Sequence, residues 1–122
     1  MRFRLLMASL TVAAATVASG IAAGPAQAGL GEDCPSGALC AYTIDWMEGT
    51  RGQVYANNTN LLQYYAFNNA HSVYNNGNDC NVRIFSGKSY TGTGVTISRD
   101  HFIQQLQTTP WYNNIASNKW CV

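Results

Sequence analysis

Charged side chains are scarce in this sequence: of its 122 residues, seven are Lys or Arg and six are Asp or Glu. The cations are dispersed, so no basic stripe is available to neutralise the phosphates of a nucleic acid. No cationic amphipathic segment that would bind a membrane surface occurs either. We therefore expect neither nucleic acid nor lipid headgroups as partners.

Signatures of catalysis are also missing. The only histidines are His71 and His101, and the sequence contains no H-E-x-x-H, no nucleophile elbow and no phosphate-binding glycine loop. The eleven glycines nowhere form Gly-x-Gly-x-x-Gly. These absences predict a protein that binds rather than an enzyme, with no catalytic residue and no required cofactor.

The first 28 residues have the order of a secretory signal peptide. Arg2 and Arg4 precede an apolar run over residues 5–23, and residues 26–28, Ala-Gln-Ala, are the small-residue pattern that a signal peptidase accepts. A membrane anchor is the alternative, since a spanning helix needs about 20 apolar residues. The run is mostly Ala, Val, Thr and Ser, and no stop-transfer cluster follows it. We expect cleavage after residue 28, an extracellular location and no membrane association afterwards.

All four cysteines, Cys34, Cys40, Cys80 and Cys121, follow this cleavage point. An even number in an exported chain indicates two disulfides, and three pairings are formally open. The turn-forming residues 35–37, Pro-Ser-Gly, bring Cys34 and Cys40 together, so we favour Cys34–Cys40 with Cys80–Cys121. A zinc site is the alternative use of four cysteines, but paired C-x₂₋₄-C knuckles are missing.

Residues 29–122 are too few for more than one domain, and a chain of this size buries a thin core that disulfides commonly reinforce. The net charge of this part is −1, from five Lys or Arg and six Asp or Glu. We expect it to be a monomer.

An internal repeat divides residues 29–122 into two units, about 34–78 and 79–122. An aromatic residue precedes a glycine by seven positions in each unit, and an Asn-Asn-x-x-Ser sequence follows, with offsets of 43 and 45 residues. The matching sequences are Tyr42-x₃-Trp46-x₂-Gly49 with Phe85-x₄-Tyr90-x-Gly92, and Asn68-Asn69-x-x-Ser72 with Asn113-Asn114-x-x-Ser117. Ordered recurrence at nearly constant spacing indicates two structural units.

The local signals are those of an all-β fold. Residues 39–42, 53–55, 81–85 and 94–98 are short and β-prone, and Gly, Asn, Asp and Ser fill the gaps. Four strands per unit would make a Greek key, and two Greek keys would make a sandwich with a shared core. Residues 100–106 begin with the capping residue Asp100 and predict one short helix in a connection.

The aromatic-x₄-aromatic-x-Gly sequence with its later serine resembles the βγ-crystallin motif. The opening Cys-Pro-Ser-Gly-x-Leu-Cys-x-Tyr of residues 34–42 is similar to that of secreted actinobacterial peptidase inhibitors related to the Streptomyces metalloproteinase inhibitor. This resemblance implies an extracellular peptidase as partner, with metallopeptidases as targets. The family's protease-binding loop is clamped by a short cysteine pair that is absent here, and the positions that we expect to replace it are Cys80, Asn81, Val82 and Arg83.

The resemblance also implies calcium binding through Asn-Asn-x-x-Ser, with these candidate ligands: Asn68, Asn69, Ser72, Asn113, Asn114 and Ser117. Neither copy contains an Asp, so calcium would bind weakly. The alternative is that these side chains hydrogen-bond their own turns. A glycan-binding module is a further alternative to inhibition, with Trp46, Tyr64-Tyr65 or Trp111-Tyr112 stacking on sugars, although we expect Trp46 and Trp120 to serve the core.

Overall fold

Seven strands and three short helical turns form the part of the chain that the structure describes, residues 30–122 of a computed structural model. The predicted signal peptide lies outside the described residues. The strands are β1 (Ala38–Ile44), β2 (Glu48–Val54), β3 (Ser72–Asn76), β4 (Val82–Gly87), β5 (Thr91–Ile97), β6 (Phe102–Ile103) and β7 (Ser117–Trp120). The helical turns are η3 (Leu61–Gln63), α2 (Tyr65–Asn68) and η4 (Lys88–Tyr90). Within these residues, no helix has the length and hydropathy needed to cross a membrane.

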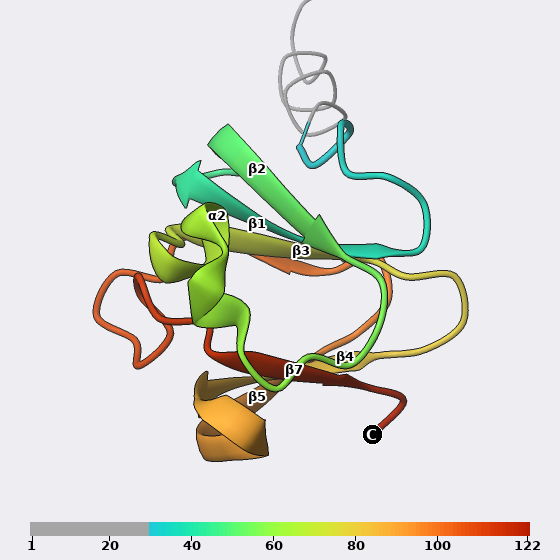
Figure 1. Cartoon of the computed structure of the whole chain (residues 1–122). Helices are drawn as coiled ribbons and strands as arrows, with labels where there is room; N and C mark the ends of the chain where they lie inside the picture. Colours follow the sequence, from blue (N-terminus) through green and yellow to red (C-terminus); the bar gives the residue numbers. More distant parts are fainter. Residues whose placement is uncertain (1–29) are drawn as a thin grey trace, which may run out of the picture. The chain divides into compact units, whose positions relative to one another are not determined.

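The strands form two antiparallel sheets that face each other (Figure 1). Sheet A has the order β2-β1-β3-β6, and sheet B has the order β5-β4-β7. The predicted all-β sandwich is therefore confirmed, and the four β-prone segments of the sequence overlap β1, β2, β4 and β5.

Alternation along the strands turns one face of each sheet toward the other. Leu39 and Ala41 of β1 and Val82 and Ile84 of β4 are completely buried. They belong to one hydrophobic cluster that both sheets share, together with Leu61, Ala66, Phe67, Ala70, Val73, Ile97, Leu106 and Ile115. Burying a side chain of Leu or Ile size contributes about 1.5–3 kcal/mol, so this shared core is the main source of stability.

The β1–β2 and β4–β5 hairpins have the same construction. Gly49 and Gly92 have φ values of +83° and +79°, which glycine adopts without the strain that a Cβ would cause. A hydroxyl near the end of the first strand accepts a backbone N–H at 2.9 Å in both hairpins, Thr43 Oγ1 from Thr50 N and Ser86 Oγ from Thr93 N. All these pairs are related by a shift of 43 residues, which agrees with the repeat in the sequence.

A buried serine closes each hairpin over its sheet. Ser72 Oγ donates to Ile44 O at 2.8 Å and accepts from Met47 N at 2.9 Å. The equivalent bonds run from Ser117 Oγ to Gly87 O at 2.7 Å and from Tyr90 N to Ser117 Oγ at 3.0 Å. The serines of the two Asn-Asn-x-x-Ser sequences therefore fix the folded hairpins.

Each half of the chain contributes a segment to the sheet of the other half. β6 pairs with β3, where Phe102 lies opposite Tyr74. Asn58, which precedes η3, forms an antiparallel bridge with Asn118 of β7 through two backbone hydrogen bonds of 3.1 Å. The two halves are therefore interleaved in one sandwich.

The helix predicted over residues 100–106 is wrong. Asp100, the expected cap, has φ +63°, and its N–H donates to Asn75 O at 2.8 Å. Asn75 N donates in turn to His101 O at 3.0 Å, and β6 follows at once. Pairing with β3 thus satisfies backbone groups that a helix would have bonded internally.

Candidate functional site: an edge anchored by Cys80 and Cys121

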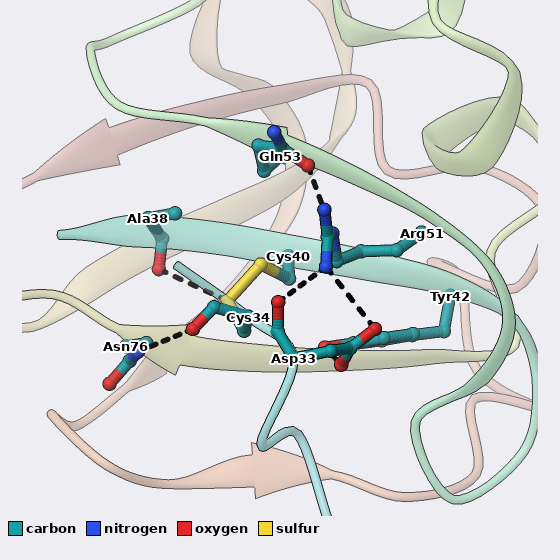
Figure 2. A network of polar contacts seen from close by, with 8 residues as sticks. All are labelled: Asp33, Cys34, Ala38, Cys40, Tyr42, Arg51, Gln53 and Asn76. Atoms are coloured by element: carbon teal, nitrogen blue, oxygen red, sulfur yellow. Dashed lines mark hydrogen bonds and ion pairs between the residues drawn. A yellow bond between two sulfur atoms is a disulfide. The ribbon is translucent and has the colours of Figure 1, made fainter. Parts of the chain in front are cut away.

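The segment before β1 lies across the outer face of sheet A (Figure 2). The Tyr42 hydroxyl donates to Asp33 Oδ1 at 2.9 Å, and Arg51 Nη1 lies 3.3 Å from Asp33 Oδ2 and donates to the Asp33 carbonyl. Burial, and after it the hydrogen bond to Asp33, raise the pKa of the Tyr42 phenol well above its ordinary value. Tyr42 is therefore a neutral donor at any physiological pH.

Covalent and packing contacts hold the same segment. The Cys34–Cys40 disulfide, with Cα atoms 6.0 Å apart, ties it to β1, and Asn76 Nδ2 of β3 donates to Cys34 O at 2.7 Å. Gly31 approaches the Tyr74 ring so closely that a Cβ would lie 2.9 Å from Tyr74 Cδ2. The chain's own N-terminal segment thus covers this part of sheet A.

The second disulfide lies at the start of β4. Cys80 and Cys121 are bonded, with Cα atoms 5.1 Å apart, so both bridges have the pairing favoured from the sequence. Asn81 O accepts from Cys121 N at 2.9 Å, and Asn81 Oδ1 accepts from Val122 N at 3.1 Å. One covalent bond and two hydrogen bonds therefore fix residues 80–81 to the end of β7.

A cavity of about 210 Å³ opens beside this disulfide. Its walls include Tyr55 and Trp120 as aromatic surfaces and the loop of residues 77–80 as a polar surface. Tyr55 is 58% exposed, and the exposed Asp79 makes no ion pair with any residue of the described part of the chain. We call the loop 77–81 with Tyr55, Trp120 and Cys121 the Cys80 edge.

The four residues predicted to form an inhibitory loop are arranged as the beginning of a strand. Cys80 and Asn81 are half-buried, Val82 is completely buried and Arg83 lies on the outer face of β4. The side chains that protrude are Asn78 and Asp79, which belong to no recognisable sequence motif. Their position just before a cysteine was the one signal that could have identified them.

The six predicted calcium ligands lie at equivalent turns. Asn68 and Asn113 are exposed, whereas Asn69 Nδ2 donates to Tyr65 O at 2.9 Å and Asn114 Nδ2 donates to Ser86 O at 2.9 Å. The Ser72 and Ser117 hydroxyls are already hydrogen-bonded within the hairpins. None of the six side chains is charged and both hydroxyls are occupied, so these groups fit calcium poorly, because tight calcium sites use several free oxygens and carboxylates. Calcium binding stays a prediction.

The two tryptophans that were expected in the core differ in their burial. Trp120 packs against the core, as expected, but Trp46 is 45% exposed, and its neighbour Met47 is 6% exposed and takes the place under the hairpin. Met47 rather than Trp46 is the equivalent of Tyr90, because the N–H groups of both donate to the hairpin serine. Tyr65 is 68% exposed.

Among residues 30–122, neither histidine lies in a catalytic arrangement with a nucleophile. His71 Nδ1 lies 3.6 Å from Asp45 Oδ1 and its ring packs on Tyr112, while His101 Nδ1 lies 2.8 Å from Arg99 O. Between residues 30 and 122, no group of three His, Cys, Asp or Glu side chains could hold a metal ion.

Comparisons with known proteins agree with the fold. The structure is similar to a βγ-crystallin domain studied for the evolution of the eye lens fold (TM-score 0.63, 18% identity, 72% of this chain and 89% of that chain). It is also similar to IPSE/alpha-1 from Schistosoma mansoni eggs (TM-score 0.57, 19% identity, 72% and 88%) and to a βγ-crystallin domain from Clostridium beijerinckii (TM-score 0.53, 17% identity, 68% and 95%). No curated protein matches the sequence.

Comparison of the sequence with known protein families identifies the family of this chain. Residues 27–97, which are more than half of the chain and include β1 to β5, match peptidase inhibitor family I36. The chain has a βγ-crystallin fold and belongs to peptidase inhibitor family I36, a family of inhibitors and not of enzymes.

Proposed function

We propose that this protein is secreted and inhibits extracellular metallopeptidases through the Cys80 edge. The match to peptidase inhibitor family I36 carries the proposal. Two disulfides in a chain that begins with a signal-like sequence support export, since disulfides persist in oxidising compartments. The resemblance to the Streptomyces metalloproteinase inhibitor supports the class of target.

The Cys80 edge has the physical properties that a peptidase-binding surface needs. An inhibitor must offer protruding groups that lose little conformational entropy when they bind. Asn78 and Asp79 protrude, and residues 80–81 beside them are fixed to the C-terminal end of β7. Ser36 Oγ also donates to Asn78 Oδ1 at 2.8 Å, so the loop is held on both sides.

Titration against peptidases of two classes tests the proposal. The purified protein is added in rising amounts to a thermolysin-like metallopeptidase and to a subtilisin-like serine peptidase, and residual activity is measured. We expect stoichiometric loss of metallopeptidase activity and an intact inhibitor chain by mass spectrometry. Steady cleavage of the protein, with full activity of both peptidases, would reject the function.

Substitutions separate the Cys80 edge from the rest of the surface. Asn78→Ala and Asp79→Ala are expected to raise the inhibition constant about tenfold or more, as the loss of a well-placed interface contact does. Glu48→Ala, a change of an exposed residue in the β1–β2 hairpin, is the control and should have no effect. Equal inhibition by all three variants would show that another surface binds the peptidase.

Glycan binding is the second candidate function, and the exposure of Tyr64 and Tyr65 is the observation that favours it. Exposed rings can stack on sugar faces. Affinity electrophoresis in gels that contain chitin or β-glucan tests it, with a Tyr64→Ala/Tyr65→Ala variant as control. Unretarded migration of the parent protein in every glycan would reject it.

A further inference from the structure

Charge is distributed unevenly between the two sheets. Residues 82–97 and 117–120, which form sheet B and its hairpin, contain Arg83, Lys88 and Lys119 and no Asp or Glu. The other two cations of the described residues, Arg51 and Arg99, each lie within 4 Å of an aspartate. Sheet B therefore carries three positive charges, none of which has an acidic partner in the described part of the chain.

Two of these cations, Arg83 and Lys119, lie on the outer face of sheet B, and the third, Lys88, is exposed in the same η4 turn as Tyr90. Val82 and Ile84 point into the core, so Arg83 and Phe85 point outward, and Lys119 lies directly opposite Arg83 on β7. The two cations flank a pair of aromatic rings. Arg83 Cζ is 5.6 Å from the Phe85 ring centroid, and the Phe85 and Tyr90 centroids are 5.9 Å apart. Lys119 Nζ is 5.1 Å from the Tyr90 centroid. We call Arg83, Phe85, Lys88, Tyr90, Thr96 and Lys119 the cationic face.

The pairing of Arg83 with Lys119 places two positive charges opposite each other on neighbouring strands. Like charges directly opposite each other on neighbouring strands destabilise a sheet. On the other side of Arg83 lies Thr96, whose Oγ1 accepts from Arg83 Nη1 at 3.0 Å but brings no negative charge. An anionic partner would remove this repulsion.

Sheet A shows that a chain segment can lie across the equivalent face of the other sheet. The shifts of 43 and 45 residues that relate the two halves place Tyr42 at the position of Phe85 and Tyr74 at the position of Lys119. On sheet A, the chain's own N-terminal segment lies over these positions, and the Asp33 carboxylate binds the tyrosine hydroxyl and Arg51. No described segment covers the equivalent positions of sheet B in this way.

We propose that the cationic face is a docking surface for an acidic, extended surface segment of the target peptidase. This inference rests on the proposed function. The cationic face continues from the Cys80 edge along β4, and it would give the peptidase a second contact surface. Carboxylates of the peptidase would pair with Lys119, Lys88 and Arg83, and the Phe85–Tyr90 pair would pack against its apolar atoms. Such complementarity mainly accelerates association.

A peptide titration tests the surface without any peptidase. The ¹⁵N-labelled protein is titrated at low ionic strength with a ten-residue peptide of alternating Glu and Tyr, and with the same peptide in which Gln replaces Glu. Amide shifts are expected in β4, β5 and β7 with the Glu peptide only. They should disappear in Lys88→Glu/Lys119→Glu and persist in Arg99→Glu, a single charge reversal outside the face. Shifts scattered over both sheets, equal shifts with the Gln peptide, or no shifts would overturn the proposal.

Inhibition kinetics identify the occupant. At low salt, Lys88→Glu/Lys119→Glu should slow association with the metallopeptidase at least about tenfold, whereas Arg99→Glu should change it less than about twofold. The Lys119→Glu variant should also melt no lower than the parent, because a carboxylate would then face Arg83. Unchanged association overturns the docking surface and leaves inhibition standing. A protein that binds the Glu peptide on this face but inhibits no peptidase would show that the peptidase is not the occupant.

Discussion

Replacing the hairpin serines by alanine tests how the sandwich is held together. In Ser72→Ala, the N–H of Met47 loses its acceptor and the carbonyl of Ile44 loses its donor, and Ser72 itself is completely buried. An unsatisfied buried polar group costs about 1–3 kcal/mol, so we expect a loss of about 2–3 kcal/mol in the free energy of unfolding. For a domain of this size, that lowers the Tm by roughly 10 °C or more.

The same change in the second half gives an internal comparison. Both hydrogen bonds of Ser117 are partly buried, whereas the bond from Met47 N to Ser72 is fully buried, so Ser117→Ala should cost less than Ser72→Ala. Ser98→Ala, an exposed serine outside both hairpins, is the matched control and should change the Tm little. Chemical denaturation of the three variants measures the differences. Losses below about 0.5 kcal/mol in both hairpin variants would refute the role of these serines.

Three further predictions concern the disulfides, a tyrosine and calcium. Removing the Cys80–Cys121 bridge by Cys80→Ala/Cys121→Ala should lower the free energy of unfolding by about 4 kcal/mol, because the bridge joins residues with a sequence separation of 41. Cys34→Ala/Cys40→Ala should lower it by about 2 kcal/mol, because that separation is only 6. Urea denaturation measures both losses, and equal losses would contradict this. The free energy of unfolding should fall as the pH rises above about 10, because Tyr42 ionises there in the unfolded chain while burial keeps the folded phenol neutral. Tyr42→Phe should weaken this fall, and an unchanged pH profile would contradict it. If calcium binds weakly at the Asn-Asn-x-x-Ser turns, millimolar calcium should raise the Tm slightly relative to EDTA, and an unchanged Tm would reject the calcium site.

The sequence predicted those features of the fold that depend on local signals. Gly49 and Gly92, preceded by aromatic residues at the same spacing, marked the two repeated units, and both glycines have positive φ in the equivalent hairpins. Ser72 and Ser117 were identified as a repeated pair, although their hydrogen bonds to the hairpins were not foreseen. Periodicity and turn residues carry this kind of information because it is encoded within a few neighbouring positions.

Features decided by distant segments were missed. Phe102 and Ile103 had the spacing of a short helix, but their pairing with β3 prevailed. Trp46 was expected in the core because of its place in the repeated aromatic-glycine sequence, yet the hairpin turns Met47 inward because Trp46 and Met47 have φ values of +62° and +57°. Asp79 had no motif, and only the fold shows that it lies beside the cavity and the second disulfide.

Hydrogen exchange of the complex is the most direct test of inhibition through the Cys80 edge. The protein is exchanged alone and with a catalytically inactive thermolysin-like metallopeptidase, and protection is mapped by peptide. The proposal predicts slower exchange in residues 77–83 and at Cys121–Val122, with little change in the β1–β2 hairpin. Protection confined to other segments, or exchange that the peptidase leaves unchanged everywhere, would contradict it.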